Sequence, residues 1–484
     1  MKILYVTSEV SPWAKAGGLA DISAALPRHL HARGHEVLLV VPLYGRVQRA
    51  GLDLTPVPRG QNISVRIGPH ELRFSLHTAP LEGSDQLVHF VHCSQLYNRE
   101  GLYTQDDDEH LRFIALSYAA LAACQRLGFS PDIAHVHDWQ SAIIPLALRC
   151  RYAWDHKRFG RTKTVLTIHN LGHQGAIPAH KLQDTGLADS AHLFHQDQLD
   201  AGIVNLMLTG ILYADAVTTV SPTYAREIQT PELGMGLDAF LRARASTVVG
   251  ILNGIDPTEW SPETDKRIAH RYSRADLAGK ERNKYALLTS LGLPYVEGVP
   301  VAGVVSRLTG QKGLELVLEV LPHFLARGQI QLTVLGSGAS GLEEAFSALQ
   351  RRFPRSVCFY RGFSNDLAHQ IEAGADLFLM PSRYEPSGLN QMYSMNYGTI
   401  PIVRATGGLR DSVQHFDRQT GRGTGVVFDH FNAEGLRWAV RQALDIYSDG
   451  GARAQIRDNA MSQDFSWQRR VAIYETLYER LHRG

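Results

Sequence analysis

The first half of the chain predicts strands separated by helices, because its apolar positions change repeatedly from continuous runs to helical spacing. Residues 3–7 form a short apolar run typical of a buried strand. Apolar residues at positions 20, 22, 26 and 30 then recur at helical spacing before strand character returns at 37–41. This is the pattern of a βαβ unit. Three further short apolar runs, separated by helical stretches, lie at 133–136, 165–168 and 216–220.

Residues 61–92 depart from this pattern, because polar and apolar residues alternate there. Alternation with a period of two predicts strands with one buried face. We therefore expect an antiparallel excursion, which either inserts into the first sheet or extends it.

The second half repeats the strand–helix pattern more regularly. Its apolar runs, each followed by a helical pattern, lie at 301–305, 330–335, 356–360, 376–380, 400–403 and 425–428. Regular alternation of buried strands and helices predicts a doubly wound parallel sheet. Residues 247–262 hold two prolines and several turn residues, which is typical of a connection. We therefore expect an α/β protein with two domains, 1–248 and 249–465, followed by a terminal segment, 466–484.

Composition narrows the class of protein further. A chain of 484 residues is too long for one hydrophobic core. With 49 Lys and Arg against 48 Asp and Glu, the net charge of +1 gives no excess of the kind that attracts nucleic acid or anionic lipid. The four cysteines are scattered, without a C-x-x-C pair, and we find no cleavable signal pattern and no run of 18 apolar residues. These features predict a cytoplasmic protein with neither a membrane nor a nucleic-acid partner.

The candidate chemistry begins with two cations, Arg307 and Lys312, placed where the apolar run 301–305 gives way to a helical pattern. A strand that ends in a turn and opens a helix offers unpaired backbone N–H groups and the positive end of the helix dipole, which suit an anion. A guanidinium that grips two oxygens, together with a mobile ammonium, favours a diphosphate. The alternative is that both are ordinary solvated surface charges.

A glycine-rich segment points to a different ligand. Gly336, Gly338 and Gly341 follow a predicted strand and open a helix, which matches the G-x-G-x-x-G fingerprint of dinucleotide-binding proteins. However, the next predicted strand ends in Tyr360 and Arg361, without the acidic residue that would bind the ribose hydroxyls of NAD. The fingerprint also lies well inside its domain, so we do not expect a nicotinamide cofactor.

Two groups of residues suggest metal sites. The stretch 106–109, Asp-Asp-Asp-Glu, has the D-x-D spacing that holds a divalent ion on a sugar nucleotide, but acidic residues also favour helix starts. His135, His137 and Asp138, with His169, stand at predicted strand ends without a defined full set of zinc ligands. We therefore expect a solvated helix start at the first, and polar contacts to a ligand at the second.

Two more segments follow predicted strands. Residues 15–21, Lys-Ala-Gly-Gly-Leu-Ala-Asp, bring a cation and glycines whose amides can approach an anion. Residues 385–391, Glu-Pro-Ser-Gly-Leu-Asn-Gln, place a carboxylate and free amides where a helix begins. Each could be a plain helix entry. Together with Arg307 and Lys312, however, they fall at the C-terminal ends of strands in both predicted domains, where open α/β sheets bind ligands.

These segments together resemble one family. The motifs that carry the resemblance lie at 15–21, 135–139 (His-Val-His-Asp-Trp), 167–171 (Thr-Ile-His-Asn-Leu), 220–228, 252–256 (Leu-Asn-Gly-Ile-Asp), 306–313, 385–389 and 464–467. The set, which spans essentially the whole chain, resembles bacterial glycogen synthase and plant starch synthase. The resemblance implies two Rossmann-like domains facing across a deep cleft (the GT-B type), with a final helix crossing back to the N-terminal domain. It also implies retaining glucosyl transfer from ADP-glucose to the non-reducing end of an α-1,4-glucan such as glycogen, without a metal or other cofactor.

The resemblance also implies a role for each matching residue. Arg307, Lys312 and Lys15 would bind the diphosphate with the amides of Gly17 and Gly18. His169 and Asp138 would hold the glucosyl hydroxyls, and Glu385 would stabilise positive charge on the sugar. The remaining pocket and nucleotide contacts would come from Asp21, Asn253, Phe363, Gly388 and Leu389, with Phe363 stacking on the adenine ring.

Three alternatives remain open at this point. The chain could be a retaining glycosyltransferase that uses another nucleotide, UDP-glucose above all, or one that glucosylates a small acceptor. It could also be a non-catalytic sensor of sugar nucleotides on the same fold. The presence of Arg307, Lys312, His169 and Glu385 favours an enzyme over a sensor.

Overall fold

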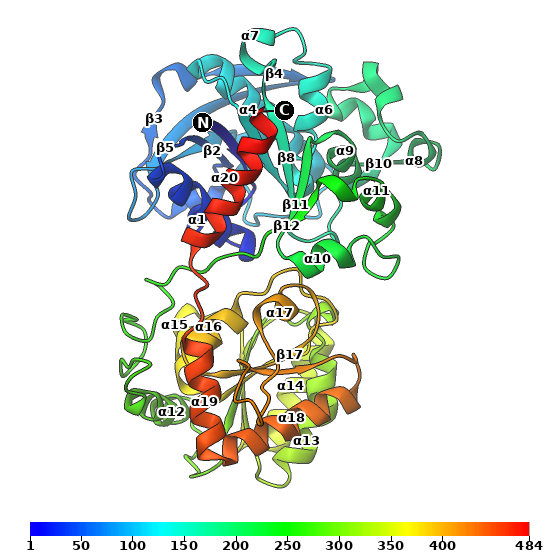
Figure 1. The fold of residues 1–484 in the computed structure, drawn as a ribbon. Helices are drawn as coiled ribbons and strands as arrows, with labels where there is room; N and C mark the ends of the chain where they lie inside the picture. Colours follow the sequence, from blue (N-terminus) through cyan, green and yellow to red (C-terminus); the bar gives the residue numbers. More distant parts are fainter. Residues whose placement is uncertain (484) are drawn as a thin grey trace. The chain divides into compact units, whose positions relative to one another are not determined.

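The chain forms two units in a computed structural model that describes residues 1–483 (Figure 1). The N-terminal unit comprises Met1–Val220, Ala225–Ile251 and the chain from Trp467 onward, and the C-terminal unit comprises Ser221–Tyr224 and Leu252–Ser466. The sequence placed the two principal boundaries at 248/249 and 465/466. The structure places them at 251/252 and 466/467.

The N-terminal unit is built on a sheet whose core strands are all parallel. In spatial order these are β12 (Val248–Gly250), β11 (Ala216–Thr219), β8 (Lys163–Ile168), β7 (Ile133–His137), β1 (Lys2–Val6), β2 (Glu36–Pro42) and β6 (Leu87–His92). An antiparallel extension follows at the β6 edge, consisting of β5 (His70–Pro80), β3 (Thr55–Pro56) and β4 (Ile63–Ile67). Within the excursion at 61–92, β6 therefore belongs to the parallel core as well, because it pairs in parallel with β2.

The C-terminal helix α20 (Trp467–Arg483) packs beside α1 (Gly18–Ala32) in the N-terminal unit (Figure 1). Its buried residues are Trp467, Val471, Tyr474, Leu477 and Tyr478. This spacing of three and four residues places them on one face of the helix. Glu475 also accepts a hydrogen bond from the Arg33 side chain at 2.8 Å. The last helix therefore completes the core of the first unit.

The other helices of this unit connect or cover its strands. The longest is α4 (Glu109–Leu127), which is almost entirely buried. The shorter helices are α2 (Gly45–Arg49), α3 (Ser94–Tyr97), α5 (Asp138–Ser141), α6 (Ile144–Arg149), α7 (His156–Phe159), α8 (Gln196–Asp200), α9 (Leu206–Tyr213), α11 (Asp238–Ala243) and α10 (Pro222–Glu227), whose first residues belong to the other unit. A two-stranded ribbon, β9 (Ala176–Pro178) with β10 (Ile203–Asn205), lies apart from the main sheet.

The C-terminal unit has six parallel strands in the Rossmann order. Across the sheet they run β15 (Val357–Arg361), β14 (Gln331–Gly336), β13 (Val301–Val305), β16 (Leu377–Met380), β17 (Ile400–Arg404) and β18 (Val426–Phe428). Numbered along the chain this is 3-2-1-4-5-6, the order of the doubly wound nucleotide-binding fold. The two parallel sheets confirm the predicted α/β class.

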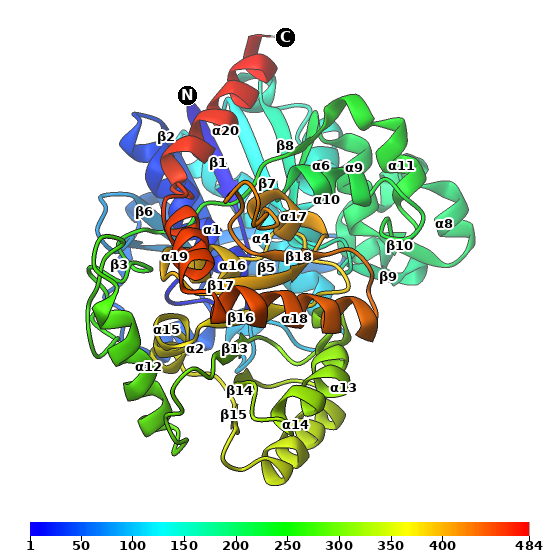
Figure 2. The same cartoon turned by 60° about the horizontal axis from the view of Figure 1, so that its bottom comes forward.

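Alternate residues of these strands feed two separate cores, one on each face of the sheet. On β13, Ala302 and Val304 join one buried cluster, whereas Val301 and Val305 join the other. The first cluster includes residues of α13 (Leu314–Leu325), α14 (Ser340–Arg352) and α18 (Ala433–Ser448), and the second includes residues of α12 (Ala278–Ser290), α15 (Asn365–Gly374) and α16 (Asn390–Asn396) (Figure 2). Two further helices, α17 (Gly407–Ser412) and α19 (Gly450–Met461), complete the unit. The continuous apolar runs in the sequence reflect this burial on both faces.

None of the helices within residues 1–483 is both long enough and apolar enough to cross a bilayer.

Candidate active site

Each sheet has a point where the strand order reverses, and several of the residues singled out in the sequence follow the strands beside these two points. In the C-terminal unit the reversal lies between β13 and β16, and in the N-terminal unit between β1 and β7. Loops that follow the strands on either side of such a point form the usual ligand-binding crevice of an open α/β sheet. Arg307 and Lys312 follow β13, and Glu385 follows β16. Lys15 follows β1, and Asp138 follows β7.

Arg307 is an exposed cation on a well-anchored turn. Its neighbour Leu308 is fully buried, and the Leu308 N–H donates to the carbonyl of Ser337 at 2.8 Å. Within residues 1–483, the Arg307 guanidinium makes no ion pair or hydrogen bond, and the nearby Thr309 hydroxyl is buried without a partner. A fixed backbone that presents an unpaired guanidinium suits the binding of an anion from outside the chain.

The glycine fingerprint supports this turn. A Cβ atom on Gly336 would lie 2.1 Å from the Ser306 carbonyl oxygen, and one on Gly338 would lie 2.3 Å from the Leu308 carbonyl oxygen. These glycines therefore allow the segment carrying Arg307 to pass directly over the end of β14. They also follow the second strand of the sheet rather than the first, where dinucleotide-binding proteins carry the fingerprint.

Lys312 and Glu385 form an ion pair. The Lys312 ammonium lies 2.6 Å from Glu385 Oε2, and the Ser382 hydroxyl donates to the same oxygen at 3.0 Å. The side chains are 19% and 6% exposed, so water screens the pair only partly. The sequence assigned the two residues to opposite charges of a ligand, and it gave no sign that they pair with each other.

The loop that carries Glu385 is held by neighbours in the same unit. Asn253 Nδ2 donates to the Ser387 hydroxyl at 3.0 Å, and the hydroxyl of Ser221 donates to the Pro386 carbonyl at 2.7 Å. Asn253 Oδ1 is buried and has no partner in the described chain. Asn253 therefore positions the loop and retains one acceptor for a ligand.

A pair of glycines at the start of α17 makes room for this loop. The Gly408 N–H donates to the Glu385 carbonyl at 3.0 Å. A Cβ atom on Gly408 would lie 2.0 Å from the Ser387 carbonyl oxygen, and one on Gly407 would lie 1.9 Å from the Glu385 carbonyl oxygen. Sequence reasoning missed this contribution, although the Thr-Gly-Gly turn at 406–408, directly after β17, was a visible signal.

The other residues predicted for this unit lie either just before a helix or after a strand in an exposed position. Gly388 has a φ of 65°, the left-handed region that favours glycine, and with Leu389 it directly precedes α16, where the first amides of a helix lack partners within the helix. Phe363 follows β15, and its ring is 76% exposed. An aromatic ring this exposed offers a face for stacking.

In the N-terminal unit, Asp138 holds the backbone at His169. Asp138 Oδ1 accepts hydrogen bonds from the N–H groups of His169 at 2.7 Å and Asn170 at 3.4 Å. Burial raises the pKa of Asp138 to about 7 and lowers the pKa of His169 to about 3. The imidazole is therefore neutral near pH 7. The ring itself is held by His137, whose Nδ1 lies 2.9 Å from His169 Nε2.

The loop between β1 and α1 contains another lysine pair and an additional carboxylate. Lys15 pairs with Asp21 at 2.7 Å. The buried Glu9 accepts hydrogen bonds through Oε2 from the backbone N–H groups of Ala16 and Gly17, at 2.8 and 2.9 Å. The Gly17 amide, which the resemblance assigns to a diphosphate, is therefore bonded to Glu9. Gly18 begins α1 and carries one of its free first amides.

Glu9 was missed from the sequence, although a carboxylate close behind the first strand was a usable signal. Its second oxygen, Oε1, accepts a hydrogen bond from the Tyr103 hydroxyl at 2.7 Å. Both oxygens are thus used to shape the loop that presents Lys15 and Gly18.

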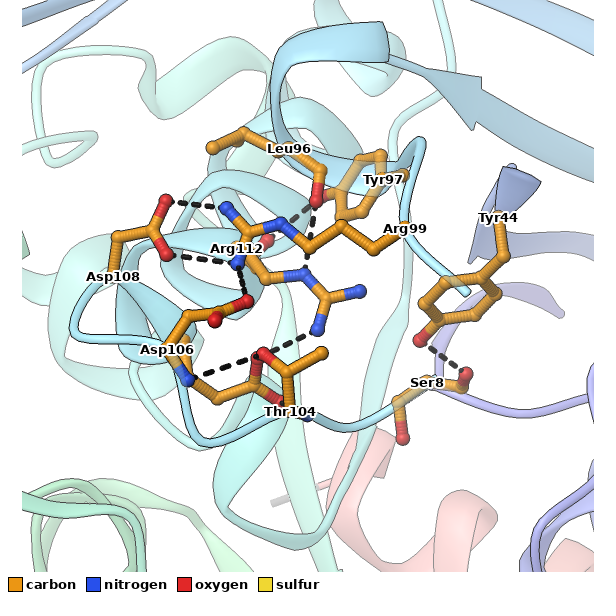
Figure 3. A network of polar contacts seen from close by, with 10 residues as sticks. Ser8, Tyr44, Leu96, Tyr97, Arg99, Thr104, Asp106, Asp108 and Arg112 are labelled. Carbon is orange, nitrogen blue, oxygen red and sulfur yellow. Dashed lines mark hydrogen bonds and ion pairs between the residues drawn. The ribbon is translucent and has the colours of Figure 1, made fainter. Parts of the chain in front are cut away.

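The acidic stretch 106–109 is occupied by cations of the protein itself (Figure 3). Arg99 Nη1 lies 2.7 Å from Asp106 and 2.8 Å from Asp108, and Arg112 pairs with Glu109 at 2.6 Å. Arg112 also donates through Nε to the Leu96 carbonyl at 2.9 Å, so this arginine network ties the chain before α4 to that helix, and the D-x-D pair takes part in it. Across residues 1–483 there is no group of three or more His, Cys, Asp or Glu side chains placed to hold a metal ion.

Comparison with known proteins decides the family. The model of the starch synthase catalytic domain matches residues 2–243, and that of glycosyl transferases group 1 matches residues 293–463. A glycogen synthase of Anaeromyxobacter sp. (strain Fw109-5) is 47% identical over 99% of both chains. The chain belongs to the glycogen and starch synthase family. It is therefore a glycosyltransferase, which confirms the family and the enzyme class predicted from the sequence.

Further relatives of the glycogen and starch synthase family agree. A glycogen synthase of Myxococcus xanthus (strain DK1622) is 44% identical over 99% of both chains. The catalytic domain of starch synthase IV from Arabidopsis thaliana, solved with ADP and acarbose bound, has a TM-score of 0.91 and 33% identity over 100% of this chain and 99% of that one. A sucrose-phosphate synthase from Thermosynechococcus elongatus, with a TM-score of 0.58 and 17% identity over 99% of this chain and 98% of that one, shares the fold.

Proposed function

We propose that this enzyme transfers glucose from ADP-glucose to the non-reducing end of an α-1,4-glucan such as glycogen, with retention of configuration and release of ADP. The observation that carries the proposal is the unpaired Arg307 beside the Lys312–Glu385 pair at the reversal point of the C-terminal sheet. Support comes from full-length relatives named glycogen synthase and from a similar starch synthase that holds ADP and acarbose.

The charges follow the course of the reaction. The bond between the anomeric carbon and the diphosphate oxygen breaks, and the anomeric carbon bonds to the 4-hydroxyl of the acceptor, whose proton passes to the leaving ADP. Negative charge grows on ADP, where Arg307 and Lys312 neutralise it and Lys15 contributes a third cation. Positive charge grows on the sugar, where Glu385 stabilises it. One such fixed contact can be worth about 3 to 4 kcal/mol in the transition state.

The other residues bind and orient the donor in this proposal. His169 and Asp138 hold the glucosyl hydroxyls, with Asp138 also fixing the His169 backbone. The Gly18 amide adds to the diphosphate contacts, and Gly17 shapes the same loop through Glu9. The remaining contacts are those of Asp21 and Asn253 with the sugar, Gly388 and Leu389 with phosphate, and Phe363 with adenine. We propose no metal ion or other cofactor for the reaction.

The direct test is to incubate the enzyme with ADP-glucose or UDP-glucose and glycogen, and to measure glucose bound to the glucan. We expect transfer from ADP-glucose to be clearly faster. Faster transfer from UDP-glucose would overturn the donor assignment, and tight binding of ADP-glucose with no transfer would indicate a sensor. Transfer only to a small acceptor would overturn the glucan assignment.

The cations are tested by substitution. Arg307→Ala or Lys312→Ala should lower turnover by at least roughly a hundredfold, because each removes charge that neutralises the leaving ADP. Arg327→Ala, an exposed arginine just beyond the far end of α13 in the same unit, is the matched control and should keep normal turnover. Near-normal turnover of folded Arg307→Ala and Lys312→Ala variants would contradict the diphosphate role.

A further inference from the structure

The His137 side chain is fully buried and its only side-chain hydrogen bond within residues 1–483 is to His169. Nδ1 of His137 lies 2.9 Å from Nε2 of His169. The other ring nitrogens of the pair, Nε2 of His137 and Nδ1 of His169, are both buried without a partner in this part of the chain. Because Nε2 of His169 is already engaged, any ligand that bonds to the His169 ring must do so through Nδ1.

The hydrogen bond between the two rings has two possible arrangements, because either ring can be the donor. Burial lowers the pKa of both histidines, so each ring is neutral and carries one N–H. If His169 donated, the proton of His137 would lie on its Nε2, which is fully buried and has no acceptor in the described chain. If His137 donates, its Nε2 is only a bare acceptor, and the remaining N–H lies on Nδ1 of His169, which also lacks a partner in the described chain. Each arrangement therefore leaves one N–H unpaired. His169 is partly exposed, so a ligand or water can approach it and accept from its N–H, whereas neither can reach the fully buried His137, and this favours donation by His137.

We propose that His137 is a positioning residue: its Nδ1–H donates to Nε2 of His169 and thereby fixes His169 as the Nδ1–H tautomer, which donates to a hydroxyl of the transferred sugar. The role of His169 toward the sugar rests on the function proposed above. The assignment of the tautomer does not depend on it.

The surroundings of His137 hold its ring in place. The His135 ring lies against it, tilted by 40° with ring centroids 4.2 Å apart, and the Tyr5 ring lies at the same distance, tilted by 33°. His135 is fixed in turn, because its Nδ1 lies 2.7 Å from the Tyr478 hydroxyl on α20 and its Nε2 lies 2.6 Å from the Thr167 hydroxyl. These buried contacts hold the His137 ring in its observed orientation.

Two adjacent residues, His137 and Asp138, thus bond to different atoms of His169. His137 holds the ring and Asp138 holds the backbone N–H, at 2.9 and 2.7 Å. A group held this way is preorganised for its ligand, since little orientational freedom remains to be lost on binding.

The kinetic test compares two substitutions at one position. His137→Phe fills the buried space but removes the donor, whereas His137→Asn keeps an N–H at the δ position. With ADP-glucose and glycogen, His137→Phe should lower turnover by about 10- to 100-fold, and His137→Asn should restore much of that loss. Wild-type turnover for His137→Phe, or an equal loss in both variants, would overturn the proposal.

A double-mutant comparison asks whether His137 acts through His169. In a His169→Ala background, His137→Phe should cause no further loss of turnover, because the residue that it positions is gone. Independent, additive losses would overturn the proposal. Tyr118→Phe is the matched control, because it removes one buried hydrogen bond of the same unit, from the Tyr118 hydroxyl to the Thr185 carbonyl at 2.8 Å, outside this group of rings. It should lower the melting temperature while leaving turnover unchanged.

The tautomer is measured directly on the wild-type protein. Two-bond proton–nitrogen correlation spectra of ring-labelled histidine distinguish Nδ1–H from Nε2–H rings, and the signal missing in His169→Ala identifies His169. We expect the Nδ1–H pattern, and an Nε2–H pattern would overturn the inference. This result is independent of transfer, so an absence of glucosyl transfer in the wild type would contradict the proposed function and leave the tautomer assignment standing.

Discussion

The pairing of Lys312 with Glu385 places an internal anion where the proposed function needs an external one. The ammonium lies 2.6 Å from the carboxylate, and both side chains are largely buried. A diphosphate that approaches Lys312 must therefore compete with Glu385 for its charge. Once Lys312 turns to the phosphate, Glu385 is left without its counterion and is able to stabilise positive charge elsewhere. Through Lys312, binding of the diphosphate therefore controls whether the carboxylate of Glu385 is neutralised.

This competition predicts opposite effects of Glu385→Gln on binding and on turnover. ADP should bind more tightly, by a factor on the order of 10, or about 1.4 kcal/mol, because the competing charge is gone. Turnover should fall by at least roughly a hundredfold, because the sugar loses its counter-charge. Calorimetry with ADP and initial-rate assays measure the two effects.

The control for this change is Glu315→Gln, which removes a carboxylate of the same unit that pairs with Arg383 at 3.2 Å. Neither ADP affinity nor turnover should change in that variant. Weaker binding of ADP to Glu385→Gln would show that the carboxylate supports Lys312 in the complex rather than competing for it.

Glu372 shows how a buried acid makes stability depend on pH. It is 1% exposed, the Ser394 hydroxyl donates to its Oε2 at 2.7 Å, and Oε1 has no partner in the described chain. Burial raises its pKa to about 8, and the neighbouring Lys280, whose own pKa is lowered by burial, offsets this only in part. The folded protein therefore binds this proton more tightly than the unfolded chain does. The resulting stability is fully present below about pH 4.5, the ordinary pKa of a glutamate, and is lost progressively as pH rises to about 8.

Glu372→Gln should remove this loss, because an amide resembles the protonated acid. The free energy of unfolding in urea should fall for the wild type between about pH 5 and about pH 8, and should fall less for the variant, since each pKa unit corresponds to about 1.4 kcal/mol. The exposed Glu344→Gln should follow the wild type. An identical pH dependence of Glu372→Gln and the wild type would contradict the assignment.

At the scale of elements, the shape of the Glu385 loop depends on the helix that follows the next strand. The loop after β16 rests on Gly407 and Gly408 at the start of α17, and a Cβ atom on Gly408 would lie 2.0 Å from a carbonyl oxygen of that loop. Backbone atoms cannot yield at such a distance as the end of a flexible side chain can. A methyl group at position 408 must therefore displace the loop or the helix.

Gly408→Ala should accordingly lower turnover by at least about 10-fold, because a shift of the Glu385 backbone misplaces its carboxylate. Gly341→Ala, near the start of α14, is the matched control, since no atom lies within 4 Å of its added Cβ. Initial rates of both variants measure the effect on turnover, and their melting temperatures show whether either variant is destabilised. Equal behaviour of the two variants would show that the loop does not rely on this contact.

Most helices and strands could be predicted from the sequence, because buried faces produce recognisable local patterns of apolar residues. Each strand of the C-terminal unit lies within a residue or two of a predicted apolar run, since both faces of its sheet are covered. The places of Arg307, Lys15 and Glu385 after strands followed from the same patterns. The Gly-x-Gly spacing alone was ambiguous, because glycines that permit close packing look the same in sequence as glycines that bind a dinucleotide.

The partners of the charged groups could not be predicted in this way. Lys312 and Glu385 are 73 residues apart in the chain, and His137 and His169 are 32 apart. Only the strand order brings such residues together, and each charge had several possible partners near the strand ends. The bond of Glu9 to the Gly17 amide spans eight residues, yet it depends on the shape of a loop that has no periodic pattern.

For the molecule as a whole, the numbers of basic and acidic residues are nearly equal. The chain has 49 basic and 48 acidic residues, a difference of +1. The proposed diphosphate contacts nevertheless include three cations, Arg307, Lys312 and Lys15. A neutral glucan should therefore bind through hydrogen bonds and ring contacts, and the nucleotide through Arg307 and through the two lysines, which would exchange Glu385 and Asp21 for the diphosphate.

The affinities for ADP and for glycogen should depend differently on salt concentration. Raising NaCl from about 0.1 M to about 1 M shortens the screening length from about 10 Å to about 3 Å, which weakens attraction between exposed charges. The affinity for ADP should fall severalfold over this range, whereas the affinity for glycogen should change by less than about twofold.

Arg307→Ala should show a shallower salt dependence of ADP affinity, because an exposed cation with no partner in the described chain contributes most of its charge to the ligand. Glycogen binding that is lost with salt would instead reveal a charged acceptor surface, and an ADP affinity indifferent to salt would contradict the role of the three cations.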